Sequence, residues 1–306
     1  MSRFLKWVTI LGIISFICIV ICFSSFFHMV SGLTGENFAF QYAEKRKHLV
    51  VLKIEGPILE ADVFLKHLGY IKENTSCQGV LVRLNSPGGA VGASQEIFQA
   101  LRDLRSESFN VVVSMGNTAA SGAYYIALGG DRIFASRGTI TGSIGVIARF
   151  PEAVQLFKKL GVSMNVVSSG KLKDAGSMFK KATREEKAYL QAVVDDTYSQ
   201  FMEDILANRA LSREDLEPLA DGRVLTGRQA QSAGLIDTLG GLREAKLYLA
   251  ELAGIEGTPL FVEAQGQKTW IDRLSSKTDV GHEALLSHIN KITSAGLFYL
   301  WPLGVF

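Results

Sequence analysis

The sequence predicts an α/β fold built around a mainly parallel β-sheet. From residue 48 onward, short runs rich in Val, Ile and Leu alternate with longer segments whose apolar residues recur at helical spacing. This alternation is typical of a parallel sheet whose strands are joined by crossover helices. The chain has 306 residues, 47% of them hydrophobic, so it can bury a substantial core in one large domain or two ordinary ones.

Each expected element follows from its own pattern. Apolar runs bounded by Gly, Pro or Asn predict strands over 48–54, 79–84, 111–115, 131–135 and 164–167. Helical spacing predicts helices over 62–73, 94–104, 124–128, 153–160, 184–209, 227–233 and 242–252. Thr183 followed by Glu186 predicts a capping box at the longest helix, and Thr226 is expected to cap a later one.

The N-terminal region predicts a membrane anchor. Residues 7–30 are almost wholly apolar and carry no Lys, Arg, Asp or Glu, a length that suits a spanning helix better than a cleavable signal peptide. Arg3 and Lys6 favour a cytoplasmic N-terminus, although the basic run 45–47 weakens that orientation. We therefore expect a short cytoplasmic segment (1–6), an anchor (7–30), a juxtamembrane linker (31–47), an extracytoplasmic domain at the cell membrane (48–260) and a C-terminal extension with an apolar tail (261–306).

Composition argues against several classes of function. A formal net charge of +2 is too small for a nucleic-acid-binding domain, which needs a concentrated basic face. The three cysteines make no disulfide framework. The five histidines are scattered and form no Cys/His cluster with ligand spacing, so we expect neither a metal nor another cofactor.

A candidate nucleophile lies in the small-residue run 117–127. The β-rich run 111–115 leads into it, and Ser121 stands among Ala and Gly before a helix-compatible segment. A tight strand-to-helix turn exposes a nucleophile and places backbone N–H groups beside it. Taken alone, the same run could be an ordinary packing turn.

The partner base is ambiguous from the residues alone. Between His67 and His282 there is no histidine, which disfavours a Ser-His-Asp triad. A lysine can replace histidine if burial or nearby positive charge keeps it neutral. Lys171 and Lys173 both follow an apolar run, and two residues apart in an extended segment they would point the same way.

Two further runs are candidates for supporting roles. Gly88 and Gly89 follow a predicted strand, where backbone N–H groups can approach a ligand closely; they could form an oxyanion hole with the N–H of Gly122. A hydroxyl in the run 141–143 could orient a neutral lysine, although a turn hydroxyl more often satisfies its own backbone.

Five runs in order resemble the SppA-type signal peptide peptidases, peptidase family S49, of the ClpP/crotonase superfamily. They are Arg-Leu-Asn-Ser-Pro-Gly-Gly (83–89), Ala-Ser-Gly-Ala-Tyr-Tyr-Ile-Ala (120–127), Thr-Gly-Ser-Ile-Gly-Val (141–146), Ser-Gly-Lys-Leu-Lys-Asp (169–174), and 221–230 with Gly-Leu-Ile-Asp (234–237). The first run alone is shared with ClpP, whereas all five together are specific. Ala123 departs from the glycine frequent in the family.

The resemblance implies a spiral of repeated ββα units and a Ser-Lys dyad. It implies Ser121 as nucleophile, Lys173 rather than Lys171 as general base, the Gly88, Gly89 and Gly122 region as oxyanion hole, and Ser143 as a residue that assists the lysine. Because the chain has the length of one copy of the domain, it also implies a homo-oligomeric ring, an octamer, whose sites are shared between subunits. The implied substrates are cleaved signal peptides and other apolar segments near the membrane.

Other functions remain open at this stage. They are a ClpP-like membrane protease acting on stomatin-type proteins, a crotonase-like CoA enzyme, and a non-catalytic membrane scaffold. The apolar tail 295–306 is too short to span a membrane. It could contact the membrane interface, dock on a neighbouring subunit or pack on its own domain.

Overall fold

The computed structural model describes residues 46–264 and 297–300. Its strands are β1 (His48–Glu55), β2 (Cys77–Ser86), β3 (Gly88–Ala90), β4 (Asn110–Ala119), β5 (Arg132–Ala135), β6 (Ile140–Gly142), β7 (Ile147–Ala148), β8 (Val224–Thr226), β9 (Thr238–Leu239), β10 (Phe261–Ala264) and β11 (Leu297–Leu300). Its helices are α3 (Asp62–Glu73), α4 (Val91–Ser106), α5 (Gly122–Ala127), α6 (Val154–Lys159), α7 (Arg184–Asn208), α8 (Arg213–Leu216), α9 (Gly227–Ser232) and α10 (Leu242–Leu252).

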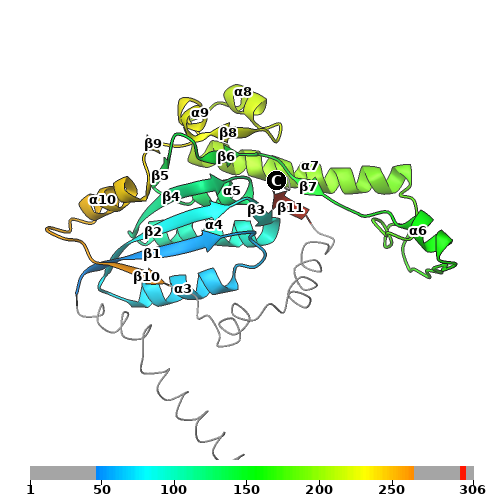
Figure 1. Ribbon diagram of the computed structural model, residues 1–306, viewed down its shortest axis with the longest axis horizontal. Helices are drawn as coiled ribbons and strands as arrows, with labels where there is room; N and C mark the ends of the chain where they lie inside the picture. Colours follow the sequence, from blue (N-terminus) through cyan, green and yellow to red (C-terminus); the bar gives the residue numbers. More distant parts are fainter. Residues whose placement is uncertain (1–45, 265–296, 301–306) are drawn as a thin grey trace, which may run out of the picture.

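The main sheet has the strand order β10-β1-β2-β4-β5-β9 (Figure 1). Every pair along this path is parallel, as the alternation of strands and helices predicts. β6 pairs with the end of β4 and, antiparallel, with β8. A second sheet has the order β3-β11-β7. The predicted α/β class with a mainly parallel sheet is confirmed.

Helices cover both faces of the main sheet, which explains why its strands are apolar on both sides. Val50 and Leu52 of β1 belong to the larger cluster, which includes buried residues of α3, α4, α5 and α7. Leu49 and Val51 face the other way and pack in a smaller cluster with residues of α10 such as Leu249. The period of two along a strand therefore divides the core into two layers.

The predicted helices are confirmed, as are the capping box at Thr183 and the N-cap at Thr226. Thr183 accepts a hydrogen bond from the backbone N–H of Glu186 at the start of α7, and the Glu186 side chain accepts one from the backbone N–H of Thr183. Thr226 caps α9 in the same way with Gln229. β10 lies in the predicted C-terminal extension, yet it pairs with β1 at the edge of the main sheet.

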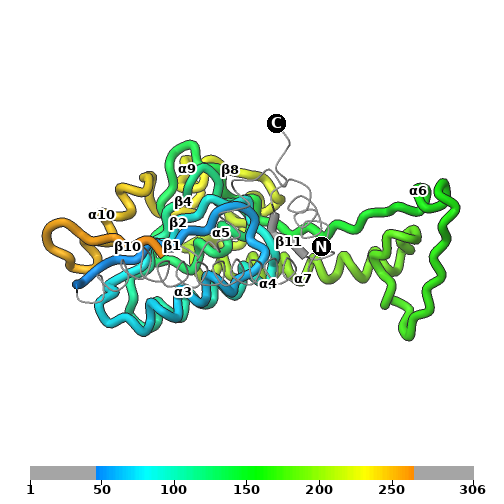
Figure 2. Tube along the Cα trace, turned by 60° about the horizontal axis from the view of Figure 1, so that its bottom comes forward, coloured from blue at the N-terminus to red at the C-terminus, as the bar shows by residue number. Residues whose placement is uncertain are grey.

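The predicted strand over 164–167 is wrong. These residues form no strand and lie in a projection of residues 149–183, which we call the arm; it extends away from the sheet in both views (Figures 1 and 2). Val167 is 100% exposed, and Met164 and Val166 are more than half exposed. A β-forming run becomes a strand only where a neighbouring strand accepts its backbone hydrogen bonds, and none lies beside this one within the described residues.

The predicted anchor, residues 7–30, lies outside the described residues, as does most of the linker. Among the residues that the structure describes, no helix is long and apolar enough to cross a membrane.

Candidate active site

Ser121 occupies a strained turn between β4 and α5. Its backbone has φ 55° and ψ −117°, a conformation that residues other than glycine rarely adopt and that is concentrated at functional sites. Its N–H donates to the Gly142 carbonyl at 2.8 Å, and its carbonyl accepts from the Tyr125 N–H at 2.9 Å. Ser121 stands at the N-cap position of α5, but its side chain makes no capping hydrogen bond, so the hydroxyl is not used to stabilise the helix.

The short helix α5 is held by its two tyrosines, both buried. The Tyr124 hydroxyl donates to the Leu235 carbonyl at 3.0 Å. The Tyr125 ring packs on Phe98 and Phe201, with centroid distances of 5.0 and 4.9 Å, and its hydroxyl donates to Asp204. These contacts fix the first turn of α5, and with it the N–H of Gly122 at the helix start.

The glycines expected in the oxyanion hole lie beside this turn. The Ala120 N–H donates to the Ser86 carbonyl at 3.2 Å, which ties the serine turn to the end of β2. Gly88 has φ 99°, a region that favours glycine, and its N–H donates to Ser86 Oγ at 3.1 Å.

Gly89 has a steric reason to lack a side chain. The Gly88 carbonyl accepts from the Ile58 N–H at 2.9 Å, and the Ala90 N–H donates to the Ile58 carbonyl at 2.7 Å. A Cβ on Gly89 would lie 1.8 Å from the Ile58 carbonyl oxygen, so only glycine allows this approach. Consecutive residues of a strand turn their backbone polar groups to opposite edges, so those of Gly89 face β11.

Ser143 lies in the connection that holds Ser121. It has φ 51°, is 6% exposed, and its N–H donates to the Arg223 carbonyl at 2.8 Å. Gly142, its neighbour, accepts the hydrogen bond from Ser121. The Thr141 hydroxyl donates to the Ala119 carbonyl at 2.7 Å, so it serves the backbone, as turn hydroxyls commonly do.

Lys173 is not brought together with Ser121 within one chain. It is exposed and lies between α6 and α7, in the arm that projects away from β4 and α5 (Figure 2). The ammonium of Lys171, by contrast, pairs with Glu185 of α7 at 2.5 Å. The single chain thus holds Ser121, Ser143 and the three glycines in one region and the lysine in another.

The structure contains a strand, β11, that the sequence did not predict. β11 lies antiparallel to β3, with Tyr299 opposite Gly89 and Leu300 opposite Gly88. Its other edge pairs with β7, with Phe298 opposite Ile147. Residues 297–300 of the tail therefore pair with strands of their own chain, which agrees with one of the three alternatives given above. The only sequence signal was a β-forming run of four residues, which gives no hint of its partner.

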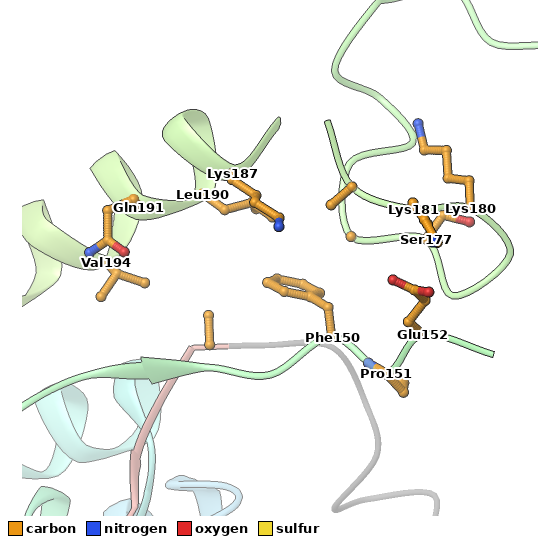
Figure 3. Close-up of a pocket in the computed structure, with 13 residues that line it drawn as sticks. Phe150, Pro151, Glu152, Ser177, Lys180, Lys181, Lys187, Leu190, Gln191 and Val194 are labelled. Atoms are coloured by element: carbon orange, nitrogen blue, oxygen red, sulfur yellow. The ribbon is translucent and has the colours of Figure 1, made fainter. Parts of the chain in front are cut away.

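A cavity of about 630 Å³ lies where the arm meets α7 (Figure 3), and Ser121 is not among the residues that line it. Phe150, Glu152 and Lys187 point toward it (Figure 3), and Ser177 and Lys180 also line it. Within the described residues, no group of three or more His, Cys, Asp or Glu side chains could hold a metal ion.

The chain belongs to peptidase family S49, whose family model matches residues 103–256. A second model, Clp protease, matches residues 44–141. The chain is therefore a serine protease with a ClpP-like α/β fold.

Relatives of known name are consistent with this assignment. The chain is 43% identical over 213 residues to "Putative protease slr0021" of Synechocystis, covering 69% of this chain and 76% of the relative. It is 39% identical to "Putative signal peptide peptidase SppA" of Enterococcus faecium, over 58% of this chain and 52% of the relative. It matches "Protease 4" of Haemophilus influenzae at 34% identity, over 64% of this chain but only 33% of that protein.

Among solved structures, the chain is similar to a mutant of the "1510-N membrane-bound stomatin-specific protease". The TM-score is 0.43 at 17% identity, covering 72% of this chain and 98% of the other. A likeness at that level carries no information about substrate.

Proposed function

We propose that the protein is a Ser-Lys endopeptidase in which Ser121 is the nucleophile and Lys173, supplied by a neighbouring subunit, is the general base. The observation that carries the proposal is the strained Ser121 turn at the start of α5, beside the glycines of β3. The Ser121 side chain makes no capping hydrogen bond to α5. The N–H of Gly122 belongs to the next residue of the chain.

The proposed reaction needs no group beyond these residues and water. Neutral Lys173 Nζ accepts the hydroxyl proton while Ser121 Oγ attacks the scissile carbonyl carbon. The N–H groups of Gly122 and Gly89 stabilise the oxyanion. Gly89 is assigned this role in preference to Gly88, because the Gly88 N–H already donates to Ser86 Oγ. The C–N bond breaks as Lys173 protonates the leaving amine. Lys173 then deprotonates a water that hydrolyses the acyl-enzyme, and Ser121 regains its proton.

A neighbouring subunit is needed because the arm carries Lys173 away from its own Ser121. The arm also exposes apolar side chains that one chain does not bury: Leu156, Leu160, Val162, Met164, Val166 and Val167. Such a surface is typical of a contact with another subunit. A ring in which each arm reaches the next subunit, an octamer by the family resemblance, would bury this surface and complete every site. Ser143, close to Ser121 through Gly142, would orient the incoming lysine.

Substrate is proposed to bind as an extended strand between β3 and β7. Protein edges that accept an added strand bind peptides mainly through backbone hydrogen bonds. β11 supports this mode, because it already makes antiparallel pairs with both strands. A peptide entering the same place would pass its backbone along Gly88 and Gly89, beside the Ser121 turn.

Cleaved signal peptides and other apolar segments near the membrane are the proposed substrates. They suit an enzyme anchored by residues 7–30 with its catalytic domain outside the cytoplasm. The relative named as a signal peptide peptidase supports this choice over stomatin-type proteins. Membership of peptidase family S49 argues against two alternatives, a crotonase-like CoA enzyme and a non-catalytic scaffold.

Labelling with a fluorophosphonate tests the assignment. Wild type and Lys171→Ala should label, whereas Ser121→Ala and Lys173→Ala should not, because the probe reports an activated serine. Lys171→Ala is the matched control, since it removes a lysine of the same loop that is paired with Glu185. Labelling of Ser121→Ala would contradict the proposal.

A further inference from the structure

Lys180 joins the loop that carries Lys173 to the start of α7. Its Nζ lies 3.3 Å from Asp174 Oδ2 and 2.5 Å from Glu186 Oε1. Glu186 also accepts a hydrogen bond from the Thr183 N–H at 2.8 Å, and its side chain is only 4% exposed. Lys180 therefore links a position beside Lys173 to a rigid capping box.

Asp174 directly follows Lys173 in the chain, which makes its charge important. A carboxylate close to a lysine favours the ammonium form, and an ammonium cannot accept a proton from serine. A general base at this position therefore needs the charge of Asp174 to be offset. Lys180 contacts Asp174 and supplies a positive charge there.

Other charged groups lie near Lys180 and Asp174. Lys171 is paired with Glu185 of α7. The hydrogen bond with Glu186 raises the pKa of Lys180, and the hydrogen bond with Lys180 lowers the pKa of Glu186, so both stay ionised at neutral pH. The other charged residues lining the cavity at the base of the arm are Glu152, Lys181 and Lys187.

We infer that Lys180 is a positioning residue for the reaction: it holds the 173–174 segment on α7 and offsets the charge of Asp174, so that Lys173 can lose its proton. Lys180 itself touches no reacting atom. The inference rests on the proposed role of Lys173 as general base, and it adds the device that keeps this lysine usable.

The test is the pH–rate profile of the full-length protein in detergent, with a fluorogenic apolar peptide. Lys180→Met should raise the midpoint pH, at which kcat/KM reaches half its maximum, by about 0.5 to 1 pH unit, the effect expected of one uncompensated charge near a lysine in a solvent-screened site. Asp174→Asn should move it downward. Lys180→Arg should restore the wild-type midpoint, and the matched control Lys181→Met should leave it unchanged.

The double variant separates electrostatics from simple loss of structure. If Lys180 offsets the charge of Asp174, adding Lys180→Met to Asp174→Asn should raise the lowered midpoint back close to the wild-type value, because the two charges act on Lys173 with opposite signs and their effects add. A lower rate with an unmoved midpoint in Lys180→Met, or a double variant whose midpoint stays at that of Asp174→Asn, would overturn the inference. If Lys180→Met does not assemble, an unmoved midpoint in Asp174→Asn overturns it instead.

Failure of the role inferred for Lys180 can be distinguished from failure of the proposed function. Lys173→Met tests the base itself: if it retains activity, the proposed function fails whatever Lys180 does. If Lys173→Met is inactive and the Lys180→Met profile does not move, only the role of Lys180 is wrong.

Discussion

The backbone N–H of Ser121 donates a 2.8 Å hydrogen bond to the carbonyl oxygen of Gly142. This bond joins the nucleophile turn to the connection that carries Ser143, although the two are far apart in the chain. Gly142 itself has φ 71° and belongs to β6, which β8 holds from its other side. Ser121, Ser143 and the glycines at 88, 89 and 122 thus lie in one region, which is the half-site that the proposed function assigns to this chain.

Mixing two inactive variants should restore activity if sites are shared between subunits. Ser121→Ala subunits keep Lys173, and Lys173→Ala subunits keep Ser121, so adjacent unlike subunits rebuild an intact site. Random 1:1 assembly should recover about a quarter of wild-type activity, because each site draws its serine and lysine independently from neighbours in a symmetric ring. Peptide cleavage by co-expressed subunits measures this. No recovery, with mixed oligomers verified by two different tags, would mean that each chain supplies its own lysine.

The rate of peptide cleavage should rise with pH. A lysine base is active only when neutral, so kcat/KM should increase as the pH approaches the range where the base loses its proton. Initial rates measured from about pH 6 to pH 10 check this, with circular dichroism confirming that the protein stays folded. A flat profile over that range would argue against a lysine base.

Gly89→Ala should abolish activity and lower stability. The added Cβ would lie 1.8 Å from the Ile58 carbonyl oxygen, so β3 must move away from Ile58 and from the Ser121 turn. We expect a loss of about 1–3 kcal/mol in unfolding free energy, as for other overpacked sites. Urea unfolding and fluorophosphonate labelling measure the two effects.

Gly92→Ala provides the matched control for that substitution. Gly92 lies in α4, and a Cβ added to it would have nothing within 4 Å. Alanine in a helix is also favoured over glycine by up to about 1 kcal/mol. Equal losses in the two variants would contradict the steric explanation.

A chain ending at Gly296 should bind peptide substrates more tightly. β11 pairs with the same strands that a substrate is proposed to use, so its removal takes away a tethered competitor. We expect KM to fall several-fold with kcat little changed, as for relief of competition with a segment held at about millimolar effective concentration. A synthetic peptide of residues 297–300 with flanking residues should inhibit the shortened chain.

The same shortened chain also distinguishes the other roles considered for the tail. Its liposome binding and subunit number should equal those of the full chain if the tail only packs on β3 and β7. An unchanged KM together with weaker liposome binding would instead favour a membrane contact.

The contribution of Glu186 to stability should depend on pH. The hydrogen bonds from Lys180 and from the Thr183 N–H lower the pKa of Glu186 in the folded protein. The stabilisation is therefore present above the ordinary glutamate value and is lost as pH falls through the lowered one. Glu186→Gln should melt earlier than wild type at pH 7, and the difference should shrink below about pH 4. A difference that stays constant down to about pH 3 would contradict this linkage.

The sequence by itself determined the local features. Helix spacing and side-chain capping act over three or four residues, so α7 with Thr183 and Glu186, and α9 with Thr226, could be predicted closely. The alternation of strands and helices was enough for the α/β class. The strand-to-helix turn at Ser121 was recognisable because small residues gather there between a β-rich run and a helix-compatible one.

Only the tertiary structure decided features that depend on distant partners. The run 164–167 has the composition of a strand, but no neighbouring strand lies beside it in the described chain, and it is exposed in the arm. The run 297–300 looks similar, yet it becomes β11 because β3 and β7 offer two open edges. Strand formation requires a partner for each backbone hydrogen bond, and a local sequence does not name that partner. For the same reason, the separation of Lys173 from Ser121 follows from the path of the arm and not from the residues of either motif.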